Sequence, residues 1–361
     1  MKYSSVLFFF IIWLRVGYTQ DSSSNKSNVT TRFYIDAYYS YDFNRPLTNE
    51  KASFVYNYKK HNRINANLAL ASVSYKGKIT RANIGLMTGT YATYNLSSEP
   101  GLLKHLFEAN AGVKISKNRN LWLDAGVMPS HIGFESAISK DCWTPTRSIL
   151  AENTPYYENG IRLSQTSKNE KVYASMFLLN GWQRTRILQS NLIPSLGTQI
   201  SYKPTSALSI NWGTFLGNMK PDSIIQWRYL NNFYAVYQMT NKLGITLGLD
   251  HGLEQKQHRS TDINIWYSPI LITRFQTKQW AFAARLEYYQ DKSGTVVPLI
   301  NDQFFQMKGY SLNIDRKIGK NNLWRLEWRY LNNTSPYFLT SSGLVSGNHS
   351  ITTSFVFEFI K

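Results

Sequence analysis

The 361-residue chain contains a single cysteine, Cys142, so an intramolecular disulfide framework is excluded. It also contains no apolar run of the roughly 20 residues that a membrane-spanning helix needs. No linker, low-complexity segment or change of composition divides the sequence after its first 31 residues. These absences favour one domain, and they exclude a bundle of transmembrane helices.

Acidic residues are scarce, with 22 Asp and Glu against 40 Lys and Arg, and the formal net charge is +18. The basic residues are spread along the chain and do not form the clustered patch of a recognised nucleic-acid-binding module. None of the six histidines stands at a metal-ligand spacing such as His-x-x-x-His. We therefore expect no nucleic-acid partner, no metal and no cofactor.

The first 19 residues have the features of a secretory signal peptide. Lys2 gives a positive start, and an apolar core of signal-peptide length follows from Val6 to Leu14. Gly17 and Thr19 are small residues at a plausible cleavage site. We expect export, with a signal peptide at 1–19, a polar segment at 20–31 and the folded domain at 32–361. Cleavage would lower the formal net charge from +18 to +16.

Aromatic residues are abundant, at 24 Tyr, 19 Phe and 10 Trp, and past residue 31 the dominant period is two. In the segment "NLWRLEWRYL" one face is aromatic or aliphatic and the opposite face is charged. The first face holds Trp324, Leu326, Trp328 and Tyr330, and the second holds Arg325, Glu327 and Arg329. Segments around 227–238, 263–276, 280–289 and 350–359 repeat the pattern. This alternation predicts β-strands with one apolar and one polar face.

The separators between these strands alternate in length. Short ones, such as "SKNRN" at 116–120 and "GKNN" at 319–322, are rich in Lys, Asn, Gly and Ser, as tight turns are. Longer, irregular ones lie between them. We therefore predict an all-β, antiparallel up-and-down β-barrel of about 16 strands that crosses a membrane, with short periplasmic turns and long extracellular loops. Both chain termini should lie at the short-turn end.

The chemistry of the two faces favours a transmembrane barrel over a soluble β-sandwich. Trp, Tyr and Phe dominate the apolar face, often near strand ends, which is typical of the aromatic girdles at membrane interfaces. Charged residues recur on the other face, as they would in a water-filled lumen. The predicted basic pore-lining residues are Arg81, Lys114, Arg162, Arg228, Arg274, Arg285, Arg325 and Arg329. The predicted acidic ones are Asp36, Glu108, Asp124, Asp250, Glu287 and Glu327.

Residues 129–156 form the longest predicted loop, and a barrel of this width leaves room for a loop to fold inward and narrow the channel. Its predicted constriction residues are Phe134, Asp141, Cys142, Trp143 and Arg147. A nucleophilic Cys142 with His131 is the alternative, but no cysteine-protease signature flanks it. We expect instead a half-buried cysteine that packs against Trp143, and no catalytic residue.

Four segments resemble the OmpL-like beta-barrel porin-2 family of Gram-negative outer membranes. They are "IDAYYSYDFNRP" (35–46), "SHIGFESAISKDCWTPTRSILAENTPYYENG" (130–160), "LLNGWQRTR" (178–186) and "PDSIIQWRYLNNFY" (221–234). The resemblance implies an outer-membrane barrel with pore activity, and it implies neither catalytic residues nor a particular solute. The chain departs from many outer-membrane barrels because it ends on Lys361 and not on an aromatic residue.

The function expected from these observations is passive diffusion of small hydrophilic solutes or ions, with a weak preference for anions because the net charge is positive. Outer-membrane lipid is the expected surrounding partner, and a homo-oligomer is left open. Two alternatives remain. One is a structural or adhesion barrel that binds a partner through its extracellular loops, and the other is a membrane-embedded hydrolase.

Overall fold

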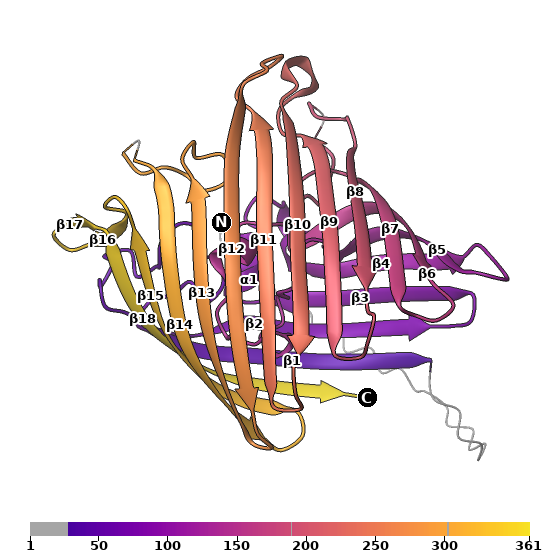
Figure 1. Ribbon diagram of the computed structural model, residues 1–361, viewed down its shortest axis with the longest axis horizontal. Coiled ribbons are helices and arrows are strands. Elements are labelled where there is room, and N and C mark those ends of the chain that lie inside the picture. Colours follow the sequence, from indigo (N-terminus) through magenta and orange to yellow (C-terminus); the bar gives the residue numbers. More distant parts are fainter. Residues whose placement is uncertain (1–27, 189, 302) are drawn as a thin grey trace, which may run out of the picture.

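The computed structural model describes residues 28–188, 190–301 and 303–361. Within them, sixteen antiparallel strands close into one barrel, β1–β15 and β18, while β16 and β17 form a separate hairpin (Figure 1). The closed barrel and its strand number confirm the predicted architecture. In the same described residues, no helix has both the length and the apolar character to cross a membrane. The predicted signal peptide, 1–19, lies outside the described residues.

Each strand is hydrogen-bonded to its neighbour in sequence, and β15 pairs with β18 across the last loop. The barrel strands are β1 Val29–Asp42, β2 Arg63–Lys76, β3 Thr80–Thr88, β4 Leu106–Lys114, β5 Asn120–Pro129, β6 Tyr157–Thr166, β7 Val172–Leu179, β8 Ser195–Tyr202, β9 Leu208–Asn218, β10 Trp227–Gln238, β11 Leu243–Gln255, β12 Ile263–Gln276, β13 Trp280–Asp291, β14 Phe305–Ile318, β15 Asn322–Asn333 and β18 Gly347–Ile360. The hairpin strands are β16 Phe338–Thr340 and β17 Gly343–Val345. The short helical segments are α1 Thr90–Asn95, η1 Gly101–His105, η2 Ser139–Asp141, α2 Ile149–Glu152 and η3 Asp222–Ile224.

The barrel closes where β1 pairs with β18, from Arg32 opposite Ile360 to Asp42 opposite Ser350. Thr31 and Lys361 exchange backbone hydrogen bonds of 2.8 and 3.0 Å, so β1 begins and β18 ends at the same rim, as predicted. β1 begins at Val29, three residues before the boundary expected from composition. Thr30 and Thr31, which follow Val29, lie at the rim, where strand pairing does not require an apolar outer face.

The outer face of the barrel carries the alternate residues of each strand. In β18, Phe355, Phe357 and Phe359 are exposed, while Val356 and Glu358 between them are buried. An outer face of exposed aromatic and aliphatic side chains of this kind is larger than the apolar patches of soluble monomers, and it is typical of transmembrane β-barrels. The strand periods read from the sequence therefore gave the correct outward faces.

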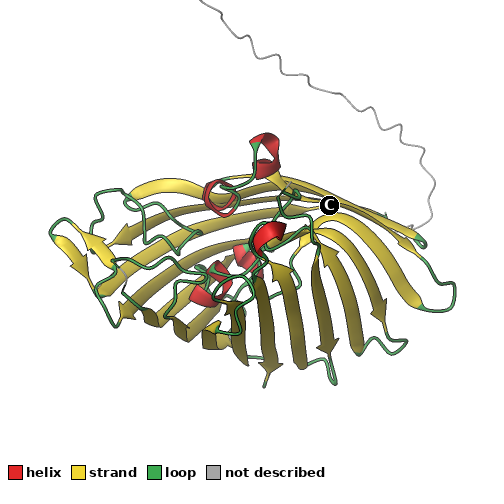
Figure 2. Ribbon diagram, turned by 90° about the horizontal axis from the view of Figure 1, so that it is seen from above, coloured by secondary structure: helices red, strands yellow, loops and turns green. Residues whose placement is uncertain are grey.

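The interior is more apolar than the alternation predicts. Phe215, Leu230, Trp266 and Met307 face inward and are buried in a cluster with residues of the long loops. Phe54 of the β1–β2 loop belongs to the same cluster, and its ring centroid lies 5.0 Å from that of Phe305. Viewed from above, loop and helical segments lie within the ring of strands (Figure 2). Part of the lumen is therefore a packed core and not a water-filled channel.

Candidate channel constriction

The loop between β5 and β6, residues 130–156, folds into the barrel and carries η2 and α2. Ser148 is the N-cap residue of α2, and its Oγ accepts a hydrogen bond of 3.1 Å from the Ala151 backbone N–H, which satisfies one of the free donors of the first turn. Ile149 and Leu150 are buried against the interior. We call this segment the constriction loop.

The lowest part of the constriction loop, toward the short-turn rim, is held by Arg325 of β15. Arg325 donates to the backbone carbonyls of Ser139 and, at 3.0 Å, Cys142. The same guanidinium forms two hydrogen bonds of 2.8 Å with Asp315 of β14. Because a planar guanidinium offers five donors, one arginine bridges two barrel strands and the loop backbone.

A second attachment joins the loop to β13 and β15. Arg285 donates to the Thr146 carbonyl at 2.8 Å and to the Thr144 hydroxyl at 3.0 Å, and its Nη2 lies 2.8 Å from Glu327 Oε1. Glu327 in turn accepts the Thr146 backbone N–H at 2.8 Å. The wall therefore supplies both donors and acceptors to the loop backbone, which would otherwise be buried without partners.

A third attachment reaches α2. Glu287 of β13 accepts the Ile149 backbone N–H at 2.7 Å and a hydrogen bond of 2.6 Å from Arg329. Arg285, Arg325 and Arg329 thus meet Asp315, Glu287 and Glu327, so this group is balanced in charge. We call these six residues the anchoring wall. All six are buried. Five of them are predicted pore-lining residues, and these five contact the loop and not an open lumen, whereas Asp315 was not predicted and pairs with Arg325.

Aromatic side chains of the constriction loop pack over glycines of β11. A Cβ atom on Gly244 would lie 2.7 Å from the Trp143 ring, and one on Gly248 would lie 2.9 Å from the Phe134 ring. The missing side chains leave room for the two rings against the wall. Arg147 is fully buried within the loop and donates to the Ala137 carbonyl at 3.0 Å, which joins the two halves of the loop.

The opposite wall has a different arrangement of charge. Arg81 of β3 donates to Asp124 of β5 at 2.6 and 2.5 Å, and Arg162 of β6 donates to the same carboxylate at 3.2 and 3.1 Å. The two arginine side chains remain 25% and 22% exposed, while Asp124 is 1% exposed. Lys114 of β4 faces the same interior and is half-buried. We call these four residues the basic patch.

The remaining predicted pore-lining residues are distributed over both regions. Asp36 is buried and accepts a hydrogen bond of 2.5 Å from Tyr58 of the β1–β2 loop. Arg228 pairs with Glu254 at 2.6 Å, and Asp250 accepts a hydrogen bond from Asn232 at 2.5 Å. Arg274 is half-buried, and its Nε has no partner among the described residues.

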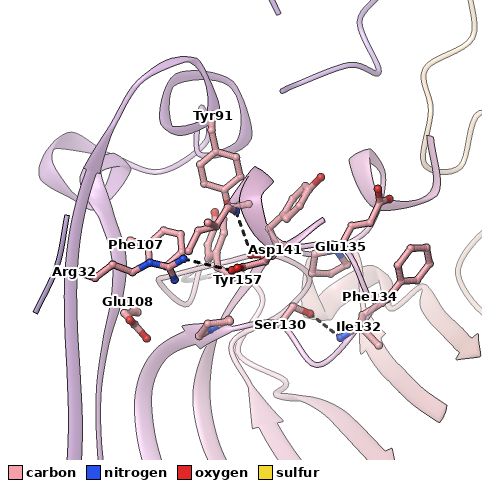
Figure 3. Close-up of a pocket in the computed structure, with 17 residues that line it drawn as sticks. Arg32, Tyr91, Phe107, Glu108, Ser130, Ile132, Phe134, Glu135, Asp141 and Tyr157 are labelled. Atoms are coloured by element: carbon pink, nitrogen blue, oxygen red, sulfur yellow. Dashed lines mark hydrogen bonds and ion pairs between the residues drawn. The ribbon is translucent and has the colours of Figure 1, made fainter. Parts of the chain in front are cut away.

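A cavity of about 360 Å³ separates part of the constriction loop from the wall (Figure 3). Glu108 of β4 lies beside it, together with Tyr91 of α1 and Phe134 of the loop. Arg32 of β1 extends toward Asp141 of the loop, with 3.6 Å between Nη2 and Oδ2. The loop therefore narrows the interior and leaves a space bordered by polar, charged and aromatic side chains.

The structure does not bring Cys142 and His131 together as a nucleophile and its base. Cys142 Sγ accepts the Ser136 backbone N–H at 3.2 Å, and burial raises the pKa of its thiol. His131 contacts Glu158 at 2.9 Å and the Thr214 carbonyl at 2.7 Å. The expected half-burial against Trp143 was wrong, because Cys142 is buried within turns of the loop backbone. Among the described residues, no group of three or more His, Cys, Asp and Glu side chains could hold a metal ion.

The β1–β2 loop, residues 43–62, covers the constriction loop and was not singled out by sequence reasoning. Its backbone N–H groups at Tyr56 and Asn57 donate to the buried Glu152 of α2 at 2.9 and 3.2 Å. Burial raises the pKa of Glu152 to about 7. The aromatic residues of "ASFVYNYKKH", Phe54, Tyr56 and Tyr58, alternate as they would in a strand, so their spacing does not reveal this loop packing.

The sequence profile of the beta-barrel porin-2, OmpL-like family matches residues 28–359. The chain therefore belongs to this family, and it is an outer-membrane porin of a Gram-negative bacterium. Among proteins with curated functions, none matches the chain by sequence.

Solved structures with similar folds have low sequence identity to this chain. An anion-selective porin from Comamonas acidovorans has 11% identity and a TM-score of 0.60, with 92% of this chain and 100% of that chain covered. The channel DcaP of Acinetobacter baumannii has 9% identity and a TM-score of 0.59, covering 93% and 99%. OmpT of Vibrio cholerae has 8% identity and a TM-score of 0.58, covering 92% and 97%. At such identities these likenesses show the fold.

Proposed function

We propose that the protein is a passive diffusion channel for small hydrophilic solutes and ions, and that it has no catalytic activity. The observation that carries the proposal is the constriction loop, which is attached to the anchoring wall inside a closed barrel and leaves the basic patch on the opposite wall uncovered. In this arrangement the loop sets the diameter of the path and the uncovered wall sets its charge.

The proposal includes a weak preference for anions. On the anchoring wall each arginine has a carboxylate partner, whereas the basic patch has three cations and one carboxylate. Mobile anions in the lumen therefore meet an excess of positive charge on the side that the loop leaves open. The similar fold of a porin described as anion-selective is in keeping with this preference.

Two experiments test the proposal with the purified protein. In planar bilayers with a salt gradient, we expect discrete conductance steps and a reversal potential whose sign indicates selectivity for anions. In liposomes, we expect small neutral sugars to enter faster than larger ones. A protein that inserts into the bilayer but neither conducts ions nor admits sugars would contradict the proposed function.

We also propose that membrane lipid covers the exposed outer face and that the barrel assembles as a homo-oligomer. One solved structure of the similarly folded OmpT is described as a trimer form, at 8% identity. Chemical cross-linking of the protein in native membranes tests this point, and recovery of monomers alone would contradict it.

A further inference from the structure

Three residues of the basic patch, Arg81, Asp124 and Arg162, lie at one level across the four neighbouring strands β3 to β6, and Lys114 lies two residues further along β4. Arg81 on β3 lies opposite Gly112 on β4, Gly112 lies opposite Asp124 on β5, and Asp124 lies opposite Arg162 on β6. The two arginines therefore approach one carboxylate from both sides. This convergence comes from the strand register, because the sequence separations are 43 and 38 residues.

Gly112 makes the approach of Arg81 possible. A Cβ atom at this position would lie 2.1 Å from Asp124 Oδ1 and 3.1 Å from the Leu123 carbonyl. Arg81 thus reaches across β4, where a larger residue would block it. Its guanidinium also lies 4.4 Å from the Trp122 ring centroid, a cation–π contact that fixes its plane. The Asp124 ion pair and this contact together hold the Arg81 fork in one orientation.

The patch keeps donors that the protein does not use. The hydrogen bonds to Asp124 come from Nε and Nη2 of each arginine, and neither Nη1 atom has a hydrogen-bond partner among the described residues. Both guanidinium groups are partly exposed, and the hydrogen bonds that fix the constriction loop reach other strands. Lys114 adds a third positive charge, so the four residues carry a net charge of +2.

We infer that the basic patch is a binding site for small oxyanions, such as phosphate or carboxylate groups, within the lumen. Oxygen atoms of such groups accept the paired N–H donors that arginine presents, which a spherical chloride ion cannot match. The inference rests on the proposed channel function and deepens it, because it assigns the preferred solutes to a class. Solutes that carry a phosphate or carboxylate would concentrate at this level of the path and cross more readily than neutral ones of the same size.

Inorganic phosphate is the probe for the test, with chloride as the conducting ion in planar bilayers. We expect phosphate to reduce the chloride current of the wild-type channel at a defined half-blocking concentration. The Arg81→Gln and Arg162→Gln variants should each raise that concentration about tenfold, as the loss of one charge-assisted hydrogen bond implies. Arg119→Gln, in the exposed turn between β4 and β5, is the matched control, and phosphate should block its current at the wild-type concentration.

The Arg81→Lys variant separates a specific site from a general positive potential. It keeps the charge but loses the planar fork, so we expect weaker phosphate block at an unchanged reversal potential in potassium chloride. Equal half-blocking concentrations in wild type, Arg81→Gln, Arg162→Gln and Arg81→Lys would overturn the site. If a Gln variant loses the compact, heat-modifiable band of a folded barrel on gels, Arg81→Lys alone decides the question.

Calorimetry distinguishes failure of the site from failure of the proposed function. Phosphate is titrated into the detergent-solubilised full chain and into the Arg81→Lys variant. Binding to the wild type that is weakened in the variant supports the site even if no channel conducts. Conductance without phosphate block and without calorimetric binding would overturn the site and leave the channel function standing.

Discussion

Arg285 and Arg81 are both arginines that face the barrel interior, but their surroundings differ and so do their roles. Arg285 is fully buried and lies within hydrogen-bond distance of Glu327 and two threonines of the constriction loop. Arg81 is a quarter exposed and keeps unused donors. A buried guanidinium must be paired with carboxylates and carbonyls, because the free-energy cost of removing its charge from water is otherwise not compensated. A partly exposed one remains available to solutes.

Replacing the buried Arg285 should lower the free energy of unfolding of the barrel. The Arg285→Gln variant leaves Glu287 and Glu327 with less compensating charge in a buried place, and breaking such a pair costs about 3–5 kcal/mol. We expect a lower urea midpoint for the barrel folded in detergent. The matched variant Arg162→Gln, at a partly exposed position, should change the midpoint little. Equal effects of the two substitutions would show that Arg285 is not buried behind the loop.

At the level of the elements, the β1–β2 loop contacts the constriction loop at Glu152 of α2. The carboxylate accepts two backbone N–H groups and the Asn57 side-chain amide, at 3.3 Å. Several titratable groups interact electrostatically with the Glu152 carboxyl group. They are Lys51, Tyr56, Lys59, Tyr91, Arg147, Tyr156 and Arg329. Burial outweighs the nearby cations, so the pKa of Glu152 is raised to about 7.

This raised pKa predicts that the contact between the two loops weakens as pH rises. The docked state holds the Glu152 proton up to about pH 7, whereas a solvated carboxyl releases it near pH 4.5. Docking is therefore most favourable below pH 4.5, and it loses up to about 3 kcal/mol between pH 4.5 and 7. We expect hydrogen exchange at 54–58, corrected for the intrinsic pH effect, to increase across this window. Glu152→Gln should remove the increase, and an increase that persists in this variant would contradict the assignment.

The constriction loop also predicts the size of the path. Deleting residues 136–147 removes η2 and the segment that Arg285 and Arg325 hold, so the lumen should widen. We expect single-channel conductance to rise about twofold or more, with larger sugars admitted to liposomes. Shortening the exposed turn between β6 and β7 is the control, since it lies at the opposite rim. Unchanged conductance after the deletion would mean that this loop does not limit the path.

For the molecule as a whole, the exposed apolar outer face of the barrel predicts that its strands lie in the membrane. Leu312 lies in the middle of β14 and is 59% exposed. A Leu312→Arg substitution places a charge near the bilayer midplane, at a cost of roughly 2–4 kcal/mol. We expect poorer insertion into lipid vesicles. Leu47→Arg, at a loop position that is 71% exposed, should insert normally. Equal insertion of both variants would contradict the placement of β14 in the membrane.

The strands and their outward faces could be predicted because a period of two is a local property. The same reading placed Arg325 on the polar face of its strand and Trp324 and Leu326 on the other. The covering of the anchoring wall could not be predicted, because Arg325 meets the Cys142 carbonyl across 183 residues. The burial of the inward-facing Phe215 and Trp266 was missed for the same reason, because they are buried by loops that are distant from them in sequence.

The lumen is divided into a covered anchoring wall and an open basic patch, and this division can be tested by cysteine accessibility. In a Cys142→Ser background, a cysteine replaces Ser74, a half-buried residue beside Asn83 on the β2–β3 side, or Ser311, a buried residue beside Arg285. A small, charged thiol reagent is added while the current through a bilayer is recorded. We expect rapid modification and a reduced current for Ser74→Cys, and protection for Ser311→Cys until residues 136–147 are deleted. Equal reactivity of the two cysteines in the full-length chain would show that the loop does not cover the anchoring wall.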